Sequence, residues 1–416
     1  MKQLIPRLLH IKSHNINYNT NQQYHHYLNI SLLITIGVLL SPTVFASIGA
    51  VEITTKKIDT NPISEFAPKP ANTTKIIDAK AWDSLMQSSL EQTQSKKSNN
   101  LLNSSAAVTS NSPTASNFKT ATKYEFVKKW GSKGTGDGQF QRPHDLDFDP
   151  TEKYLYTIDR DGNRVQVFDK DGDFIKKWGS QGTGDGQFTT PYGVDVDSKG
   201  DVWVADRGND RIQKFDKDGN FLFKFGSPGS KEGQLNTPRQ VAVDKEIKYA
   251  YVADSSNDRI VKFDTNGNFI KSWGTLGSGD GQFDKPVSVI IDSKGDIIVN
   301  DRGTNRVQKF DSDGNFILKF GSTGTGNSQF KGVEHMATDK YDNIYVNDPQ
   351  QEKYGGSMEP TVKKFDTNGN FITKFGALGK GDGQFTDPEH LAIDSDGNVY
   401  VSDRKSNTIS VFKPVG

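Results

Sequence analysis

The sequence contains no cysteine. Disulfide bonds, thiolate metal centres, iron–sulfur clusters and a cysteine nucleophile are therefore excluded. Net charge is also absent, because 51 Lys and Arg residues balance 51 Asp and Glu residues, and this argues against a phosphate-binding surface over the whole chain. Apolar residues make up only 33% of the chain, whereas there are 40 Gly and 25 Phe residues. This composition disfavours a helical bundle and favours many short strands joined by glycine turns.

The first fifty residues have the features of a targeting segment. No charged residue lies between Lys12 and Glu52, and this interval contains the apolar stretch 30–40 and a small-residue site that ends at Ala46. Two alternatives follow: a signal peptide cleaved after Ala46, or an uncleaved anchor of about twenty residues from Leu28. Both place the rest of the chain outside the cytoplasm, because the basic flank stays inside. The protein is therefore expected to be secreted or membrane-anchored.

Residues 51–123 are rich in Ser, Thr, Asn, Gln and Lys, and we expect a flexible linker there. From residue 124 onward the composition changes. Residues 124–416 hold 39 basic and 45 acidic residues, a net charge of −6. Proteins that bind nucleic acid usually carry the opposite charge, so nucleic acid is not an expected partner.

Residues 124–416 repeat with a period of about 48. The last residue of the GDGQF motif recurs with spacings of 48, 47, 48, 47 and 55, at Phe140, Phe188, Leu235, Phe283, Phe330 and Phe385. Each repeat contains four strand-like runs, a to d, which in the second repeat are 193–197, 202–206, 211–215 and 221–225. No run has a helical period long enough for a crossover. Four antiparallel strands per repeat predict an all-β propeller rather than a solenoid.

The two ends of the repeat array predict how the ring closes. A d-type run at 124–131 precedes the first GDGQF motif and has no a, b or c run of its own. The last repeat has a, b and c runs but no d run. We therefore expect the N-terminal strand to complete the last blade, which gives one six-bladed domain and removes a free sheet edge.

These motifs resemble a known repeat family. The pattern Phe-x-x-Pro, Gly-Val-x-Val-Asp and Val-Ala-Asp-Arg-x-Asn-x-Arg-Ile-Gln-x-Phe is similar to the NHL repeat, with the clearest copies at 188–215 and 283–310. The resemblance covers roughly 290 residues and implies a propeller. It does not imply one function, because propellers host many unrelated activities.

The start of each a strand contributes the residues that differ between repeats. The two positions after the strand-opening proline, or after Val333, lie at the mouth of the central channel. They are occupied by the pairs His144-Asp145, Tyr192-Gly193, Arg239-Gln240, Val287-Ser288, Glu334-His335 and Glu389-His390. We expect Tyr192, Arg239, Gln240, Glu334 and Glu389 to bind a ligand there.

The three histidine-bearing repeats become neighbours once the ring closes. Imidazoles beside carboxylates are the donors that a divalent transition metal needs. Because successive residues of a strand point to opposite faces, Asp145 rather than His144 is in register with His335 and His390. The candidate ligands of one zinc or calcium ion are therefore His335, His390 and either Asp145 or His144.

A weaker local resemblance concerns an enzyme. Residues 143–146 and 205–213 are similar to peptidylglycine-amidating lyase, a zinc-dependent NHL propeller family. That resemblance implies a zinc histidine directly after the proline, which only His144 matches. It also implies a substrate-contacting arginine after the aspartate of strand b, as at Arg160, Arg207, Arg302 and Arg404.

Two functions are compatible with the sequence. The first is an extracytoplasmic binding module, acting as a monomer, that presents its d–a and b–c loops to a protein, peptide or glycan. An insertion in the b–c loop of repeat five, within 349–360, belongs to the same face. The second is a metal-dependent lyase or hydrolase at the channel mouth, in which Arg160 or Arg404 holds an anionic substrate group.

Overall fold

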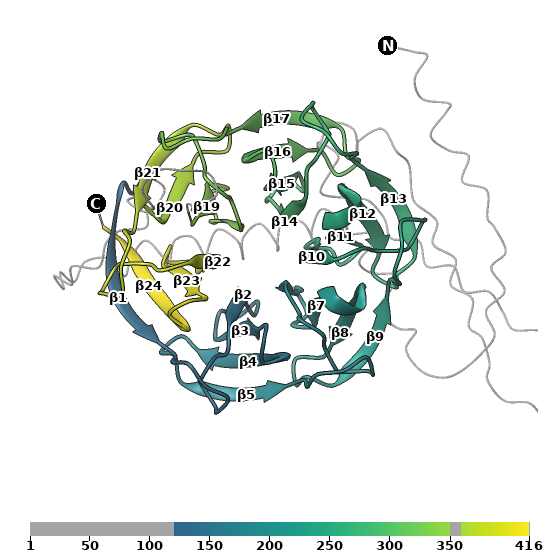
Figure 1. Cartoon of the computed structure of the whole chain (residues 1–416), viewed down its shortest axis with the longest axis horizontal. Coiled ribbons are helices and arrows are strands. Elements are labelled where there is room, and N and C mark those ends of the chain that lie inside the picture. Colours follow the sequence, from purple (N-terminus) through teal and green to yellow (C-terminus); the bar gives the residue numbers. More distant parts are fainter. Residues whose placement is uncertain (1–119, 350–358, 416) are drawn as a thin grey trace, which may run out of the picture. The chain divides into compact units, whose positions relative to one another are not determined.

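The computed structural model describes residues 120–349 and 359–415. These residues form six four-stranded antiparallel sheets, arranged as the blades of a propeller around a central axis (Figure 1). Each sheet runs from an inner a strand to an outer d strand. The expected all-β six-bladed propeller is confirmed.

Blade one contains β2 (Pro143–Phe148), β3 (Tyr154–Asp159), β4 (Arg164–Asp169) and β5 (Phe174–Trp178). Blade two contains β6 (Val194–Val196), β7 (Val202–Asp206), the 3-10 helix η1 (Arg207–Asn209), β8 (Arg211–Phe215) and β9 (Phe221–Phe225). Blade three contains β10 (Pro238–Val243), β11 (Tyr249–Asp254), the 3-10 helix η2 (Ser255–Asn257), β12 (Arg259–Asp264) and β13 (Phe269–Trp273).

Blade four contains β14 (Pro286–Ile291), β15 (Ile297–Asp301), β16 (Arg306–Phe310) and β17 (Phe316–Phe320). Blade five contains β18 (Met336–Thr338), β19 (Ile344–Asp348), β20 (Thr361–Phe365) and β21 (Phe371–Phe375). Blade six contains β22 (Pro388–Ile393), β23 (Val399–Asp403), β24 (Thr408–Val415) and the N-terminal strand β1 (Lys123–Trp130).

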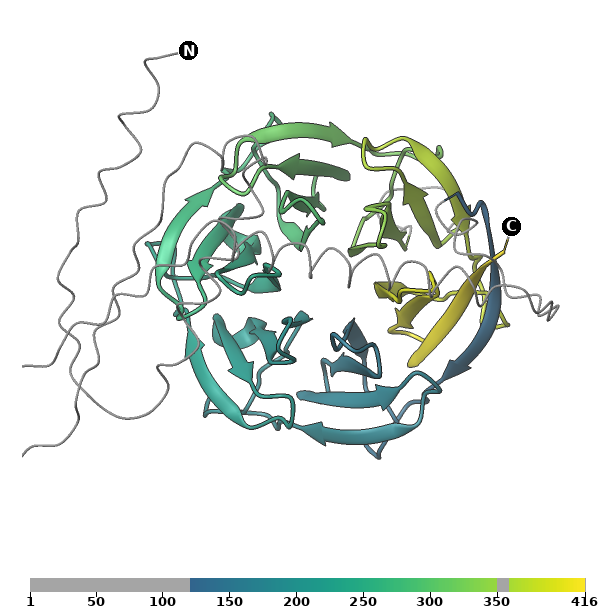
Figure 2. The same ribbon diagram turned by 180° about the vertical axis from the view of Figure 1, so that it is seen from behind.

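Blade six joins the two ends of the domain. The strand order of its sheet is β1-β24-β23-β22, and β1 pairs antiparallel with β24 from Lys123 opposite Val415 to Trp130 opposite Ile409. The view from behind shows β1 lying along the outside of β24 (Figure 2). This pairing places blade six directly beside blade one, and β2 contacts β22.

The hydrophobic core lies between neighbouring blades rather than within one sheet. The GDGQF residue of every repeat is fully buried, and Phe140 packs with Phe168 of its own blade and with Tyr400 of blade six. Burying one such ring contributes about 1.5–3 kcal/mol, so six equivalent seams hold the ring together. Gly131 fits against Phe140 because its backbone has a φ of +95° and a Cβ there would lie 2.8 Å from the ring.

The targeting segment expected at 1–50 and the linker expected at 51–123 lie outside the described residues, apart from the last four linker positions. The insertion of blade five lies outside them as well, except at its two ends. Within 120–349 and 359–415, the fold has no helix with the length and apolar character of a membrane span.

Candidate binding and metal site in the central channel

A bulge at the start of the inner strands buries both residues of the histidine pairs. In blade one, Pro143 pairs with Asp159 and Leu146 pairs with Thr157, so the two residues between them have no partner in regular register. The same irregularity follows Pro388 in β22. Because a bulge bends the strand, adjacent side chains no longer have to point to opposite faces. His144 and Asp145 are both fully buried and both contact neighbouring blades.

The three histidines and one tyrosine form a row of contacting rings across the ring closure. The rings of His335 and His390 are stacked, with centroids 4.1 Å apart. His390 lies 4.3 Å from His144, and His144 lies 3.7 Å from Tyr192. These side chains come from blades five, six, one and two, so the structure brings together the three histidines that sequence equivalence placed at the channel.

Asp145 contacts two of these three histidines. Its Oδ1 is 2.8 Å from His390 Nδ1 and 3.7 Å from His335 Nε2, and its Oδ2 accepts a hydrogen bond from the Val194 backbone N–H at 2.7 Å. Burial alone would raise the pKa of Asp145, but its interactions with His390 and His335 outweigh burial, and the pKa lies below its usual value. The side chain is therefore a carboxylate that orients His390.

The outer imidazoles are held neutral. Burial, followed by the neighbouring His390, lowers the pKa of His335 to about 3, and the pKa of His144 falls well below its usual value for the same two reasons. Both nitrogens of His144 and Nε2 of His335 are buried without a hydrogen-bond partner among the described residues. His144 Nε2 lies 3.4 Å from Glu389 Oε2. Neutral imidazoles with free nitrogens are suited to bind a metal ion.

Two groups of donor atoms could hold such an ion. His144, Glu389 and His390 offer ligand atoms that all lie within 4.8 Å of one another, and so do Asp145, His335 and His390. The two groups share His390. In the first group, Asp145 would support His390 from behind, which is the arrangement that fixes the tautomer of a metal-binding histidine. The arrangement fits a metal with nitrogen and oxygen ligands, whereas calcium prefers oxygen ligands alone.

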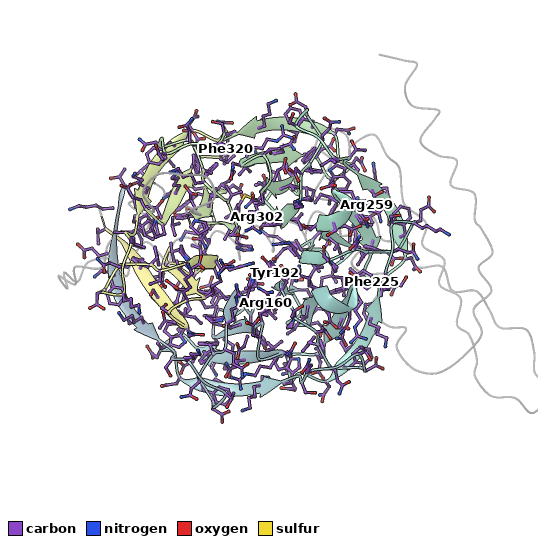
Figure 3. All side chains as sticks on the ribbon, viewed as in Figure 1. Arg160, Tyr192, Phe225, Arg259, Arg302 and Phe320 are labelled. Atoms are coloured by element: carbon purple, nitrogen blue, oxygen red, sulfur yellow. The ribbon has the colours of Figure 1, made fainter. Side chains whose placement is uncertain are left out.

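Three arginines converge on Tyr192 at the other side of the mouth. The guanidinium carbons of Arg160, Arg207 and Arg239 lie 5.8, 5.7 and 4.7 Å from the centre of its ring. Arg239 also donates a hydrogen bond of 2.6 Å to the tyrosine hydroxyl. Figure 3 labels Arg160 and Tyr192 near the centre of the ring, with Arg302 across from them. We call Arg160, Arg207, Arg239 and Tyr192 the arginine cluster.

The charge of the arginine cluster is not neutralised. In each of the three guanidinium groups Nε is buried without a hydrogen-bond partner among the described residues. Within 120–349 and 359–415, the one carboxylate paired with the cluster is Asp161, which lies 3.7 Å from Arg160 and is itself 43% exposed. Burial and then repulsion by Arg239 lower the pKa of Arg207. An anion bound here would relieve this repulsion and satisfy the unpaired donors.

The arginines of the opposite half are neutralised. Arg302 contacts Glu334 at 2.7 Å. Arg404 contacts both Glu389 and Asp387, the latter at 2.5 Å. The channel mouth is therefore asymmetric, with cationic charge in blades one to three and ion pairs in blades four to six. Of the arginines proposed to hold an anion, Arg160 belongs to the cationic half and Arg404 to the neutral half.

The three other predicted ligand-binding residues have different surroundings. Glu389 and Glu334 are buried close together, and burial followed by repulsion from Glu334 raises the pKa of Glu389 to about 8. Gln240 is buried between strands and donates to the Val194 carbonyl at 3.3 Å, so it is part of the channel wall. Sequence reasoning missed Ser402, which donates to the His144 carbonyl and accepts from the His390 backbone N–H at 3.1 Å.

The residues shared between repeats form the scaffold of the site. In blade two, Asp206 accepts hydrogen bonds from Arg211 Nε and from the Thr189 backbone N–H, both at 2.8 Å. Arg211 donates in turn to carbonyls of the preceding d–a loop. Equivalent aspartate–arginine pairs occur in blades one, three and four. These pairs therefore have a structural role and cap the turns between blades.

Comparison with known proteins agrees with this architecture. The family model described as NHL repeat matches residues 188–215 and 385–412. The chain carries NHL repeats. No curated protein matches it. Among solved structures, a protein of unknown function from Bacteroides thetaiotaomicron VPI-5482 is 18% identical, with a TM-score of 0.54 over 70% of this chain and 76% of that chain.

Two further structures resemble this NHL-repeat propeller. Virginiamycin B lyase from Staphylococcus aureus is 11% identical, with a TM-score of 0.49 over 70% of this chain and 99% of that chain. A putative gluconolactonase is 14% identical, with a TM-score of 0.48 over 71% of this chain and 95% of that chain. At such identities the likeness concerns the fold alone.

Proposed function

We propose that this NHL-repeat propeller is an extracytoplasmic binding module, secreted or held at the membrane by its N-terminal segment. Its ligand is an extracellular protein, peptide or glycan that contacts the d–a and b–c loop face and inserts a carboxylate into the arginine cluster. The observation that carries the proposal is the set of three unneutralised guanidinium groups around Tyr192. Guanidinium pairs with carboxylate through two parallel hydrogen bonds, which provides both affinity and orientation.

Charge supports a carboxylate ligand rather than nucleic acid. The propeller as a whole is mildly acidic, and the arginine cluster concentrates positive charge locally at the channel mouth. Nucleic-acid binding needs a basic surface spread along the phosphate backbone. One isolated cationic cluster suits a single anionic group on an otherwise neutral partner. Binding by one rigid face requires no second copy, and we propose that the protein acts as a monomer.

Peptides with a free C-terminal carboxylate and their amidated counterparts test this proposal. Isothermal titration calorimetry of the purified protein against such a matched library should detect binding only of the free carboxylates. Arg207→Ala should weaken that binding by about 10- to 150-fold, the range for losing one hydrogen bond to a charged group. Lys199→Ala, on an exposed turn between β6 and β7, serves as the control. Equal binding of carboxylate and amide, or full affinity in Arg207→Ala, contradicts the proposal.

A second candidate function is a metal-dependent lyase or hydrolase at the same mouth. The specific observation in its favour is the set of buried imidazole nitrogens without partners in His144 and His335. A bound zinc ion would polarise a carbonyl group or lower the pKa of a bound water. His390 would be a ligand in either donor group, Asp145 would orient it, and Arg160 or Arg404 would position an anionic group of the substrate.

Elemental analysis of the purified protein decides whether this candidate is retained. It predicts about one transition-metal ion per chain, as expected for a site with this number of ligands. His390→Ala should abolish zinc binding in a titration, because both donor groups contain His390. His335→Ala should weaken zinc binding only if the ion is held by the group that contains Asp145, so this variant distinguishes the two groups. Failure of the wild-type protein to bind zinc, cobalt or manganese ends the candidate.

A further inference from the structure

Blade six differs from the other blades beneath its d–a loop. In blades one to four, an arginine at the start of strand c lies under this loop, and in blade one Arg164 donates to the Thr135 and Gln139 carbonyls at 2.7 Å. Blade five uses Lys363, which contacts Asp348 at 2.8 Å and the equivalent loop carbonyls. In blade six the position opposite Asp403 is Thr408. A threonine is too short to fill this space.

A second substitution enlarges the same gap. Two residues after the arginine, Gln166 in blade one donates to the Gln139 carbonyl at 2.8 Å. The equivalent residue of blade six is Ser410, which pairs with Val401 as Gln166 pairs with Thr157. The result is a cavity of about 350 Å³ between the loop that follows β21 and strand β24. We call it the seam cavity, because it lies where the two ends of the domain meet.

Four lysines surround the seam cavity. Lys129 comes from β1, Lys133 and Lys380 come from d–a loops, and Lys405 comes from the b–c loop of blade six. No aspartate or glutamate lines it. Lys129 is paired with the exposed Asp382 at 3.2 Å, and Lys405 lies 3.7 Å from Asp387. Lys133 and Lys380 form no ion pair within the described part of the chain. The opening therefore has an excess of positive charge.

The seam cavity continues toward the channel. A second cavity of about 340 Å³ shares Lys133, Lys405 and Asn407 with it. The second cavity is also lined by Arg142 and Arg404, which are paired with its two aspartates, Asp161 and Asp387. Arg404 contacts Glu389 at the channel mouth as well. Together the two cavities form a polar groove from the rim of the propeller to its mouth. Such a groove has the extended shape that a chain-like ligand occupies.

We propose that this groove binds an acidic polysaccharide, one built from uronic acid units. The Lys380 loop carbonyl accepts a hydrogen bond from Lys129 at 3.1 Å, but the Gln384 loop carbonyl lacks the arginine donor present in blades one to four and can accept from a ligand hydroxyl, whereas the lysines pair with carboxylates. A sugar acid offers both on every unit. The residues lining the groove include no aromatic side chain on which a base could stack and no apolar side chain that would anchor a peptide.

The inference rests on the proposed binding role of the loop face, and it names the partner class. Its test uses the full-length protein, an oligogalacturonate of about six units, and the same oligosaccharide with its carboxylates methyl-esterified. Calorimetry should detect binding of the acidic form alone, and binding should weaken as salt increases because exposed charge pairs are screened. Polyglutamate or single-stranded DNA of similar charge should bind at least about tenfold more weakly, which corresponds to 1.4 kcal/mol.

One variant tests the groove by filling it. Thr408→Arg with Ser410→Gln introduces the residues found in blades one, two and four. This variant should reduce oligogalacturonate affinity at least about tenfold while preserving the fold, measured by circular dichroism. Should this variant not fold, Lys133→Ala with Lys405→Ala replaces it, with the same expected loss. The matched control is Lys199→Ala with Lys294→Ala, two exposed lysines on a–b turns.

The outcomes separate this groove from the arginine cluster. The filled variant should keep the wild-type affinity for peptides with a free C-terminal carboxylate, which the arginine cluster binds, so that failure of the groove and failure of the arginine cluster give different results. Unchanged affinity in the filled variant overturns the groove. Equal binding of the methyl ester overturns the requirement for uronate, and tighter binding of polyglutamate reassigns the groove to acidic peptides.

Discussion

Arg207 and Arg404 follow the aspartate of strand b in blades two and six, yet their removal should have opposite consequences for stability. Arg404 contacts the fully buried Glu389 and is itself only 20% exposed at its side chain. Arg207 has no ion pair within the described residues, and it lies near Arg160 and Arg239 over the ring of Tyr192. Arg404→Ala should destabilise the protein, whereas Arg207→Ala should not.

The magnitude follows from what each change leaves behind. Arg404→Ala leaves a buried carboxylate without its cation, and breaking a buried ion pair in this way costs about 3–5 kcal/mol. Arg207→Ala removes a cation–π contact and the repulsion between like charges, two small effects of opposite sign. Its free energy of unfolding should therefore stay within about 1 kcal/mol of the wild type. Urea unfolding followed by circular dichroism measures both values.

The pH dependence provides an internal check. The pKa of Glu389 is raised to about 8, so the carboxyl binds a proton at lower pH and then needs no counter-ion. The cost of Arg404→Ala should therefore be largest near about pH 9 and smaller near about pH 6. A cost independent of pH contradicts the assignment of this cost to Glu389. Equal destabilisation by Arg207→Ala and Arg404→Ala refutes the asymmetry of the channel mouth.

Three further predictions concern single substitutions, each measured by urea unfolding. Asp206→Ala should cost about 3–5 kcal/mol because Arg211 loses its buried partner, and a smaller cost in Asp206→Asn would support that cause. Because the pKa of Glu389 is raised from 4.5 to about 8 in the folded state, the free energy of unfolding of the wild type should fall as pH rises through this range, and Glu389→Gln should remove this part of the pH dependence. Gly131→Ala should cost more than Gly295→Ala, because both residues have positive φ but only Gly131 lies against Phe140.

The architecture could be predicted because repetition makes local signals redundant. The last residue of the GDGQF motif occurs once at each of the six seams between blades. The isolated d-type run before Phe140 predicts where the ring closes. Equivalence of the pairs after each proline also placed His144, His335 and His390 at one mouth. These predictions needed only the order of strands within a blade and the closure of the ring.

The contacts within the site required coordinates. Alternation along a strand predicted that His144 would be out of register, but the bulge after Pro143 buries it beside His390. The sequence does not distinguish Arg207 from Arg302 and Arg404, because all three follow the aspartate of a strand b. Its difference arises from Arg160 and Arg239, which come from neighbouring blades and are distant in the sequence. The repeats therefore predict where equivalent residues lie in each blade, but not which residues of neighbouring blades each of them contacts.

The departures from the repeat are concentrated at the seam that closes the ring. Blades one to five have a cation beneath the d–a loop, whereas blade six has Thr408 and is held instead by β1, with Tyr124 stacked 4.4 Å from Phe375. His335 and His390 lie on the same side of the ring. A fold that secures its other seams with repeated ion pairs can tolerate an unusual blade, because pairing of the chain ends supplies the missing stability. At this seam, Thr408 and Ser410 can therefore replace the arginine and glutamine that hold the d–a loop elsewhere, and leave room for a ligand groove, without opening the ring.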